Sequence, residues 1–246
     1  MRIGLLDRSE PQISDELLFT IHNFDHMIDN SSGHIQHVPL KKPNGAESLP
    51  GINGLILSGG ESKRMGRDKG SINYHGMSQI DFLSQFLIKF VERTYISCHP
   101  DRIPVTKHEV LPDTFLNLGP YGGVLSAFRH DPDSAWLVVA CDIPMLDESV
   151  ITHLINERDP NKVATCIHDP STGLPEPLIT IWEPRAYPIL LHFLSQGISC
   201  LRKTLIHTDV KQIDIDRPEV LMNVNTPEEA NNVREMLKTL QREINT

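Results

Sequence analysis

Cysteine is scarce in this chain, with 4 residues among 246, and the four lie far apart. No two of them are separated by only two residues, the spacing that marks half of a zinc site or a redox motif. The sequence therefore argues against a disulfide framework and against a cysteine-based metal centre. It predicts reduced core residues at Cys98, Cys141, Cys166 and Cys200.

Long apolar runs are also lacking, because no stretch approaches the roughly 20 residues of a membrane-spanning helix. The first residues lack the charged, apolar and small-residue succession of a signal peptide. Positive charge is in the minority, with 23 Lys and Arg against 32 Asp and Glu and a net charge of −9. Such a chain is a poor general binder of nucleic acid or anionic membranes. We expect a cytoplasmic protein with neither as partner, which meets anions through local clusters of cations.

The length predicts one large domain with an appendage. We expect an N-terminal extension over residues 1–50, either a partial α/β unit or an arm, and a main domain over residues 51–246. In the extension, residues 3–6 have the composition of a strand and residues 14–22 a helical pattern. Lys41-Lys42-Pro43-Asn44-Gly45 is typical of a linker.

From about residue 52 onward, apolar runs typical of strands alternate with amphipathic helical patterns. Strands are expected over residues 52–57, 94–98, 136–141, 163–167, 178–182, 211–215 and 220–224. Helices are expected over residues 78–92, after the N-cap Asp147, between Pro184 and Gly197, and after Thr226-Pro227-Glu228-Glu229, which forms a capping box. The alternation predicts an α/β fold with three layers and a mainly parallel central sheet.

A glycine-rich, basic loop follows the first strand of the main domain. Glycine lets backbone N–H groups approach a phosphate closely, and cations neutralise its charge. The loop is not a Walker A motif, because five residues separate Gly60 from Gly66 and Arg67 follows, and it lacks the dinucleotide-binding Gly-x-Gly-x-x-Gly. A solvated loop without a ligand is the alternative. Four cations within seven positions favour a phosphate site: Lys63, Arg64, Arg67 and Lys69.

Polar residues also follow two later segments of the predicted sheet, at the edge where open parallel sheets bind ligands. Asp142 ends the strand over 136–141, and Asn223 and Asn225 directly precede the last helix. Taken alone, Asp142 could cap a helix and the asparagines could form a turn. A polyphosphate at the neighbouring loop would make Asp142 a Mg²⁺ ligand, because Mg²⁺ prefers one or two carboxylates together with phosphate oxygens.

Together these motifs resemble the nucleotidyltransferases that include the molybdenum cofactor guanylyltransferases, which have a Rossmann-like, glycosyltransferase-A-type fold. The resemblance covers roughly residues 52–243. Three departures are Ser58 and Gly70, where alanine is common, and Tyr121, where leucine is usual. The matching segments, in the family's order, are residues 57–69, Asp113 with Gly119-Pro120-Tyr121-Gly122-Gly123, Cys141-Asp142-Ile143-Pro144, and Asn223-Val224-Asn225-Thr226-Pro227.

The resemblance implies a nucleoside triphosphate substrate and a set of site residues. By position, the backbone of Leu57, Ser58, Gly59 and Gly60 would hold the base and phosphates, and Asp113 would contact the nucleoside. Arg64 and Lys69 would grip the triphosphate, Asp142 and Asn225 would hold Mg²⁺, and Arg64, Lys69 and Asp142 would be catalytic. The acceptor side would comprise Pro177, Arg202 and Asn223, with ordinary strand and surface charge as the alternative.

The implied reaction transfers GMP from GTP to the phosphate of molybdopterin and releases pyrophosphate. That phosphate is already an anion at neutral pH, so the protein must supply positioning and charge neutralisation rather than a general base. A cytidylyltransferase, or another nucleotidyltransferase acting on a phosphorylated small molecule, is one alternative. A non-catalytic nucleotide-binding regulator is another. Other proteins of cofactor biosynthesis are the expected macromolecular partners.

Overall fold

The computed structural model describes residues 3–6, 26–29, 36–39, 49–58 and 69–244. The chain divides into two compact units, Met1–Leu49 and Pro50–Thr246. The helix expected over residues 14–22 and the linker at residues 41–45 lie outside the described residues.

The first unit contains a three-stranded sheet in the order β1-β2-β3. The strand expected over residues 3–6 is confirmed as β1 (Ile3–Leu6). It pairs in parallel with β2 (His26–Asp29), and β2 pairs antiparallel with β3 (Gln36–Pro39).

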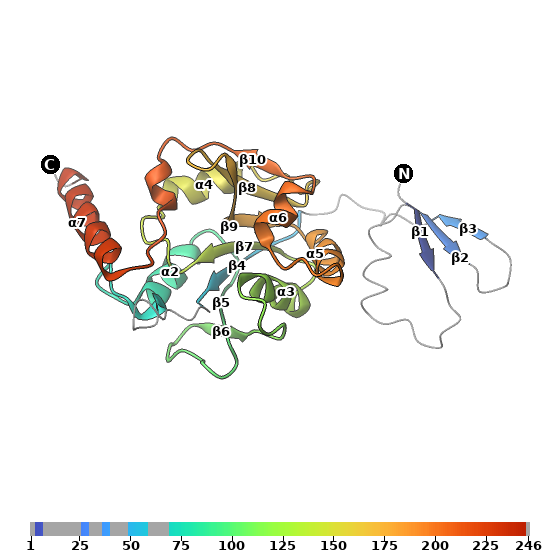
Figure 1. Cartoon of the computed structure of the whole chain (residues 1–246), viewed down its shortest axis with the longest axis horizontal. Helices are drawn as coiled ribbons and strands as arrows, with labels where there is room; N and C mark the ends of the chain where they lie inside the picture. The colour runs from blue at the N-terminus through green and yellow to red at the C-terminus, as the bar shows by residue number, and fades with distance from the viewer. Residues whose placement is uncertain (1–2, 7–25, 30–35, 40–48, 59–68, 245–246) are drawn as a thin grey trace. The chain divides into compact units, whose positions relative to one another are not determined.

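A seven-stranded sheet forms the centre of the second unit, in the order β10-β8-β9-β7-β4-β5-β6 (Figure 1). The strands are β4 (Ile52–Leu57), β5 (Thr94–Cys98), β6 (Glu109–Pro112), β7 (Ala135–Ala140), β8 (Ala164–Asp169), β9 (Leu174–Trp182) and β10 (Lys211–Ile213). The helices are α2 (Gln79–Leu87), α3 (Pro120–His130), α4 (Glu148–Asn156), α5 (Ala186–Ser195), α6 (Leu201–Ile206) and α7 (Pro227–Ile244), with 3-10 turns η1 (Lys69–Ser71) and η2 (Pro218–Leu221).

Strand β9 alone runs against its neighbours in this sheet. It pairs antiparallel with β7 and β8, whereas β10 with β8, β4 with β7, β4 with β5 and β5 with β6 are parallel. Helices α2 and α4 cover one face, and α3, α5 and α6 the other (Figure 1). All six residues of β7 are buried, as expected of a parallel strand covered on both faces. The three-layer α/β fold with a mainly parallel sheet is therefore confirmed.

Alternate residues of the central strands build the core on each side of the sheet. On one face, Val139 of β7 packs in the same cluster as Leu83 of α2 and Ile151 of α4. On the other, Phe128 of α3 stacks on Tyr187 of α5, with ring centroids 5.7 Å apart. Because both layers pack directly on the sheet, the ends of the strands are held in fixed relative positions.

Several elements differ from the sequence-based expectations. The strand expected over residues 220–224 is wrong, because Val220 and Leu221 belong to η2 and bury their side chains in the core. Pro218 starts this turn with a helical φ, and a short, mostly apolar segment does not by its periodicity distinguish a strand from a buried turn. Strands β2, β3 and β6 and helices α3 and α6 were not expected.

The predicted capping box at the start of α7 is confirmed. The Glu229 N–H donates to Thr226 Oγ1 at 3.2 Å, and the Thr226 N–H donates to Glu229 Oε2 at 3.1 Å. Ala230 and Val233 then pack against Met145, which docks α7 beside the segment after β7. Within the ranges that the structure describes, no helix has both the length and the apolar character needed to cross a membrane.

Candidate active site

Backbone hydrogen bonds join the segments that leave the carboxyl ends of β4, β5 and β7. The Cys141 N–H donates to the Leu57 carbonyl at 3.1 Å, and the Ser58 N–H donates to the Ser97 carbonyl at 3.1 Å. The Ser58 hydroxyl donates to that same Ser97 carbonyl at 3.1 Å. The backbone at the start of the glycine loop is thus fixed by both neighbouring strands.

A further backbone bond brings the segment before α7 to the same edge. The Val224 N–H donates to the Asp142 carbonyl at 2.8 Å, so Asn225 is one residue from a direct link to Asp142. Asp142 is half-buried, whereas Asn223 and Asn225 are exposed. The Asn225 N–H donates to Glu229 Oε2 at 2.6 Å, which anchors the segment to the first turn of α7. The segments that carry this carboxylate and this amide, predicted at separate strand ends, are therefore joined directly.

Part of the predicted triphosphate grip lies outside the described residues. This applies to Gly59, Gly60 and Arg64. Lys69 is the first residue of η1, and its side chain is not among those described. The roles assigned to these four residues stay predictions.

Asp113 occupies a partly buried position at the end of β6, beside β5. Its Oδ1 accepts a hydrogen bond from the Ser97 hydroxyl at 2.7 Å, and its backbone N–H donates to the Cys98 carbonyl at 2.8 Å. Burial raises the pKa of Asp113, while the Ser97 hydroxyl opposes the rise by stabilising the carboxylate. Ser97 is a functional candidate that the sequence did not single out, because its partner is 16 residues away.

The glycines after Asp113 allow α3 to approach the sheet closely. A Cβ on Gly123 would lie 2.6 Å from Ser97 Oγ and 2.7 Å from Leu57 Cδ2. The segment was expected to contact the nucleoside, and it lies against two residues of the site. Tyr121, the departure from the family pattern, is buried and donates its hydroxyl to the Leu190 carbonyl of α5 at 2.7 Å.

His75 connects the segment after η1 to the turn that carries Asp142. Its Nε2 lies 3.0 Å from the Pro144 carbonyl oxygen, and its ring stacks on Phe82 with centroids 3.7 Å apart. Burial lowers the pKa of His75, so the ring is neutral at pH 7. Because a carbonyl oxygen only accepts, Nε2 carries the proton of the neutral ring.

Tyr74 is a second residue that the sequence analysis missed. The Arg234 guanidinium lies 5.4 Å from the centroid of its ring, and Arg234 Nε donates to the Asn73 carbonyl at 3.2 Å. Burial raises the pKa of Tyr74 to about 12 against the opposing charge of Arg234, and the Asp142 carboxylate adds to the rise. A lone tyrosine between a basic loop and a helix carries no sequence signal, so only the fold reveals this position.

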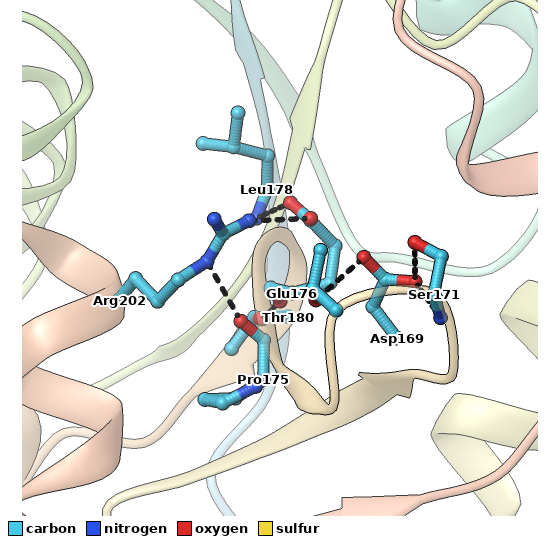
Figure 2. Close-up of polar contacts among 8 residues, drawn as sticks. Asp169, Ser171, Pro175, Glu176, Leu178, Thr180 and Arg202 are labelled. Atoms are coloured by element: carbon cyan, nitrogen blue, oxygen red, sulfur yellow. Dashed lines mark hydrogen bonds and ion pairs between the residues drawn. The ribbon is translucent and has the colours of Figure 1, made fainter.

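Two of the predicted acceptor residues, Pro177 and Arg202, lie on or against β9, the strand next to β7. Pro177 is buried in β9, where the pairing with β8 shifts register between Cys166 and Ile167. Arg202 of α6 is half-buried and reaches Glu176 of β9, with Nη2 and Oε2 3.1 Å apart (Figure 2). The sequence predicted Arg202 as an acceptor contact, with surface charge as the alternative, but it did not predict the pairing with Glu176.

Among the described residues, no group of three or more His, Cys, Asp or Glu side chains could hold a metal ion. Asp142 supplies a carboxylate, and Asn225, on the segment bonded to it, supplies an amide oxygen, two kinds of ligand that suit Mg²⁺. Two protein ligands of this kind fit an ion whose remaining ligands are phosphate oxygens and water.

The MobA-like NTP transferase domain model matches residues 54–210, well over half of the chain. A Molybdenum cofactor biosynthesis bifunctional protein from Synechocystis is 33% identical over 181 residues, covering 72% of this chain and 52% of that protein. This chain thus spans about half the length of that relative. A Probable molybdenum cofactor guanylyltransferase from Nostoc is 31% identical over 186 residues, covering 72% of this chain and 88% of that protein.

The fold is shared with a solved structure, Molybdopterin-guanine dinucleotide biosynthesis protein A from Archaeoglobus fulgidus. The two have a TM-score of 0.63 and 20% identity, and the match covers 76% of this chain and 99% of that one. The family match includes the strand ends that carry Ser58, Asp113 and Asp142, and the segment with Asn223 and Asn225 follows it. The chain belongs to the MobA-like NTP transferase domain family and is a nucleotidyltransferase.

Proposed function

We propose that this nucleotidyltransferase transfers GMP from GTP to a molybdopterin-type acceptor and releases pyrophosphate. The observation that carries the proposal is the contact between the Asp142 turn and the segment of Asn225, at the edge where the glycine loop begins. The names of the Nostoc and Synechocystis relatives supply the acceptor and the nucleotide. A phosphate-binding loop beside a carboxylate and an amide is the donor set that such a transfer needs.

The nucleotide side rests on Ser58, Asp113 and the basic loop. The Ser58 backbone, held by Ser97, starts the loop whose N–H groups would bind the phosphates. Asp113, oriented by the Ser97 hydroxyl, would accept hydrogen bonds from the nucleoside. Arg64 and Lys69 would stabilise the charge that grows on the leaving pyrophosphate.

Asp142 and Asn225 would hold Mg²⁺. The bound ion would neutralise phosphate oxygens of the nucleotide, a task that one lysine and one arginine cannot complete for a triphosphate. The backbone bond between Val224 and Asp142 keeps both ligands together before any ion arrives. The acceptor phosphate, already ionised, would attack the α-phosphorus, so that no side chain has to remove a proton.

The test incubates the protein with Mg²⁺, molybdopterin and each nucleoside triphosphate in turn, and measures pyrophosphate release. We expect release with GTP. Release with CTP alone would identify a cytidylyltransferase, and tight GTP binding without release would identify a regulator. Asp142→Asn should abolish turnover and leave the melting temperature within about 2 °C, because the replacement has nearly the same shape and keeps the backbone bond to Val224. Asp133→Asn, at an exposed carboxylate just before the amino end of β7 and so at the opposite edge of the sheet, is the matched control.

A further inference from the structure

The half-buried Arg202 is held by two partners on the first residues of β9 (Figure 2). Its Nε donates to the Pro175 carbonyl at 3.2 Å, and its Nη2 donates to Glu176 Oε2 at 3.1 Å. A guanidinium fixed at two of its three nitrogens has a set orientation, which a flexible ammonium would lack.

Glu176 is the buried member of the pair. Its side chain is 5% exposed, against 37% for Arg202. Its other oxygen, Oε1, accepts the Leu178 N–H at 2.9 Å, and its own carbonyl accepts the Thr180 hydroxyl at 2.6 Å. Both of its carboxylate oxygens are therefore engaged within the protein. The part of the pair that solvent and ligands reach is the cation.

A second carboxylate in the neighbourhood is also engaged. Asp169 at the end of β8 accepts the Ser171 N–H at 2.9 Å, the Ser171 hydroxyl at 2.7 Å and the Thr172 hydroxyl at 2.8 Å (Figure 2). The turn between β8 and β9 thus binds this carboxylate internally. Both carboxylates are therefore bound within the protein, while the guanidinium of Arg202 stays partly accessible to solvent.

The reversed direction of β9 puts this pair beside the Asp142 turn. The last paired residues of β7 and β9 are Val139 and Ile179. Asp142 lies three positions after Val139, and Glu176 lies three positions before Ile179. Because the two strands are antiparallel, both residues lie beyond this last pair in the same direction, at the same edge of the sheet. Neighbouring strands are roughly 5 Å apart. An acceptor whose phosphate reaches the nucleotide at Asp142 would extend past Arg202.

We infer that Glu176 is a positioning residue, which holds the Arg202 guanidinium so that it binds an anionic group of the acceptor. The inference rests on the proposed function, because it names a contact of the same acceptor. An anionic group on a small molecule, phosphate or an ionised oxygen, is the chemistry that a fixed guanidinium recognises best. Glu176 contributes through Arg202 and does not itself contact the acceptor.

The test measures steady-state kinetics and direct molybdopterin binding by calorimetry for Glu176→Gln, Arg202→Gln and the double variant. Glutamine at 176 keeps an oxygen for the Leu178 N–H, and its NH2 group takes the place of the oxygen that accepts from Arg202, so the charge and the acceptor that orient Arg202 are both removed. We expect Arg202→Gln to raise the KM for the acceptor roughly 10- to 100-fold, and Glu176→Gln to raise it about tenfold, with the KM for GTP unchanged. The double variant should be no worse than Arg202→Gln, because both changes remove one interaction.

Lys203→Gln is the matched control, because Lys203 is the exposed neighbour on the same helix and carries the same charge. It should leave the acceptor KM within about twofold, as expected of an exposed charge. An unchanged acceptor KM in Glu176→Gln, or additive losses in the double variant, would overturn the inference. So would equal rises in both KM values with a lower melting temperature, the signature of a purely structural residue.

The calorimetric measurement of molybdopterin binding distinguishes a failure of this inference from a failure of the proposed function. If the wild-type protein binds molybdopterin but releases no pyrophosphate, the proposed function fails, and the affinity ratio between wild type and Glu176→Gln still decides the role of Glu176. If the wild-type protein binds no molybdopterin, both fail.

Discussion

Replacing Glu183 by glutamine should destabilise the protein strongly, because Glu183 shares a buried ion pair with Arg158. The Arg158 Nε and Nη2 donate to the two carboxylate oxygens at 2.7 and 2.9 Å, and Nη1 donates to the Pro50 carbonyl at 2.9 Å. The two side chains are 8% and 1% exposed. The pair ties the residue after β9 to the end of α4 and to the residues before β4.

The size of the destabilisation depends on the unpaired charge of Arg158 that the substitution leaves in the protein interior. Removing one partner of a buried ion pair leaves the other charge uncompensated and costs about 3–5 kcal/mol. For a domain of this size each kcal/mol lowers the melting temperature by roughly 2–4 °C, so Glu183→Gln should lower it by about 6–20 °C. The control is Lys89→Ala, because Lys89 pairs with Glu148 at 57% and 61% exposure. An exposed pair contributes less than about 1 kcal/mol.

The assay is urea unfolding followed by circular dichroism, with scanning calorimetry as a second measure. A third variant, Arg158→Met combined with Glu183→Leu, removes both charges and should recover more than half of the lost stability, because no unpaired charge is left. A loss in Glu183→Gln as small as that in Lys89→Ala would refute the reasoning. So would a double variant as unstable as the single one.

Three other expectations concern single sites. Ser97→Ala should raise the pKa of Asp113 further, because it deletes the hydroxyl that favours the carboxylate. The folded-state pKa of Asp113 already lies above its unfolded value, so stability falls as pH rises through it and is lower above it. The variant should extend that loss to higher pH, and an NMR titration of the carboxylate that shows no change would contradict this. Gly123→Ala should weaken GTP binding at least tenfold in calorimetry, because the added Cβ would displace Ser97 from Asp113; unaltered affinity would count against it. The core position predicted for Cys200 is wrong, because its side chain is exposed, so Ellman's reagent should react rapidly with it. The other three thiols should react only after unfolding, because they are buried and burial raises the pKa of Cys166 to about 12. Rapid reaction of a second thiol would disprove this.

The sequence predicted those parts of the fold that have a clear hydrophobic pattern or a clear local motif such as a helix cap. Strand β4 has the predicted bounds, and the caps at Asp147 and Thr226 are formed by their own side chains. Helix α3 was missed because Gly122 and Gly123, which usually mark loops, serve close packing there. Strand β6 is a short edge strand with an exposed first residue, so neither alternation nor full burial marked it.

The residues of the candidate site also fall into those that the sequence could predict and those that it could not. Asp142 and Asn225 could be placed at one sheet edge because each follows or precedes an element with a clear signal, and the Val224–Asp142 bond joins their segments. Ser97 and Glu176 could not be found, because a serine inside a strand and a glutamate between prolines have no local signature. Their interest comes from partners 16 and 26 residues away, which only tertiary structure supplies.

The reversed strand β9 has a consequence for how such enzymes could diversify. Parallel strands deliver their carboxyl ends to the catalytic edge, but β8 and β9 deliver a short connecting turn over residues 170–173. Surface turns tolerate insertions and deletions better than strands do. A longer or shorter turn would reshape the rim beside Arg202 and leave β4, β5 and β7 in place. The choice of acceptor could then change, in evolution or in a designed variant, without a change in the strands that carry the proposed nucleotide-binding residues.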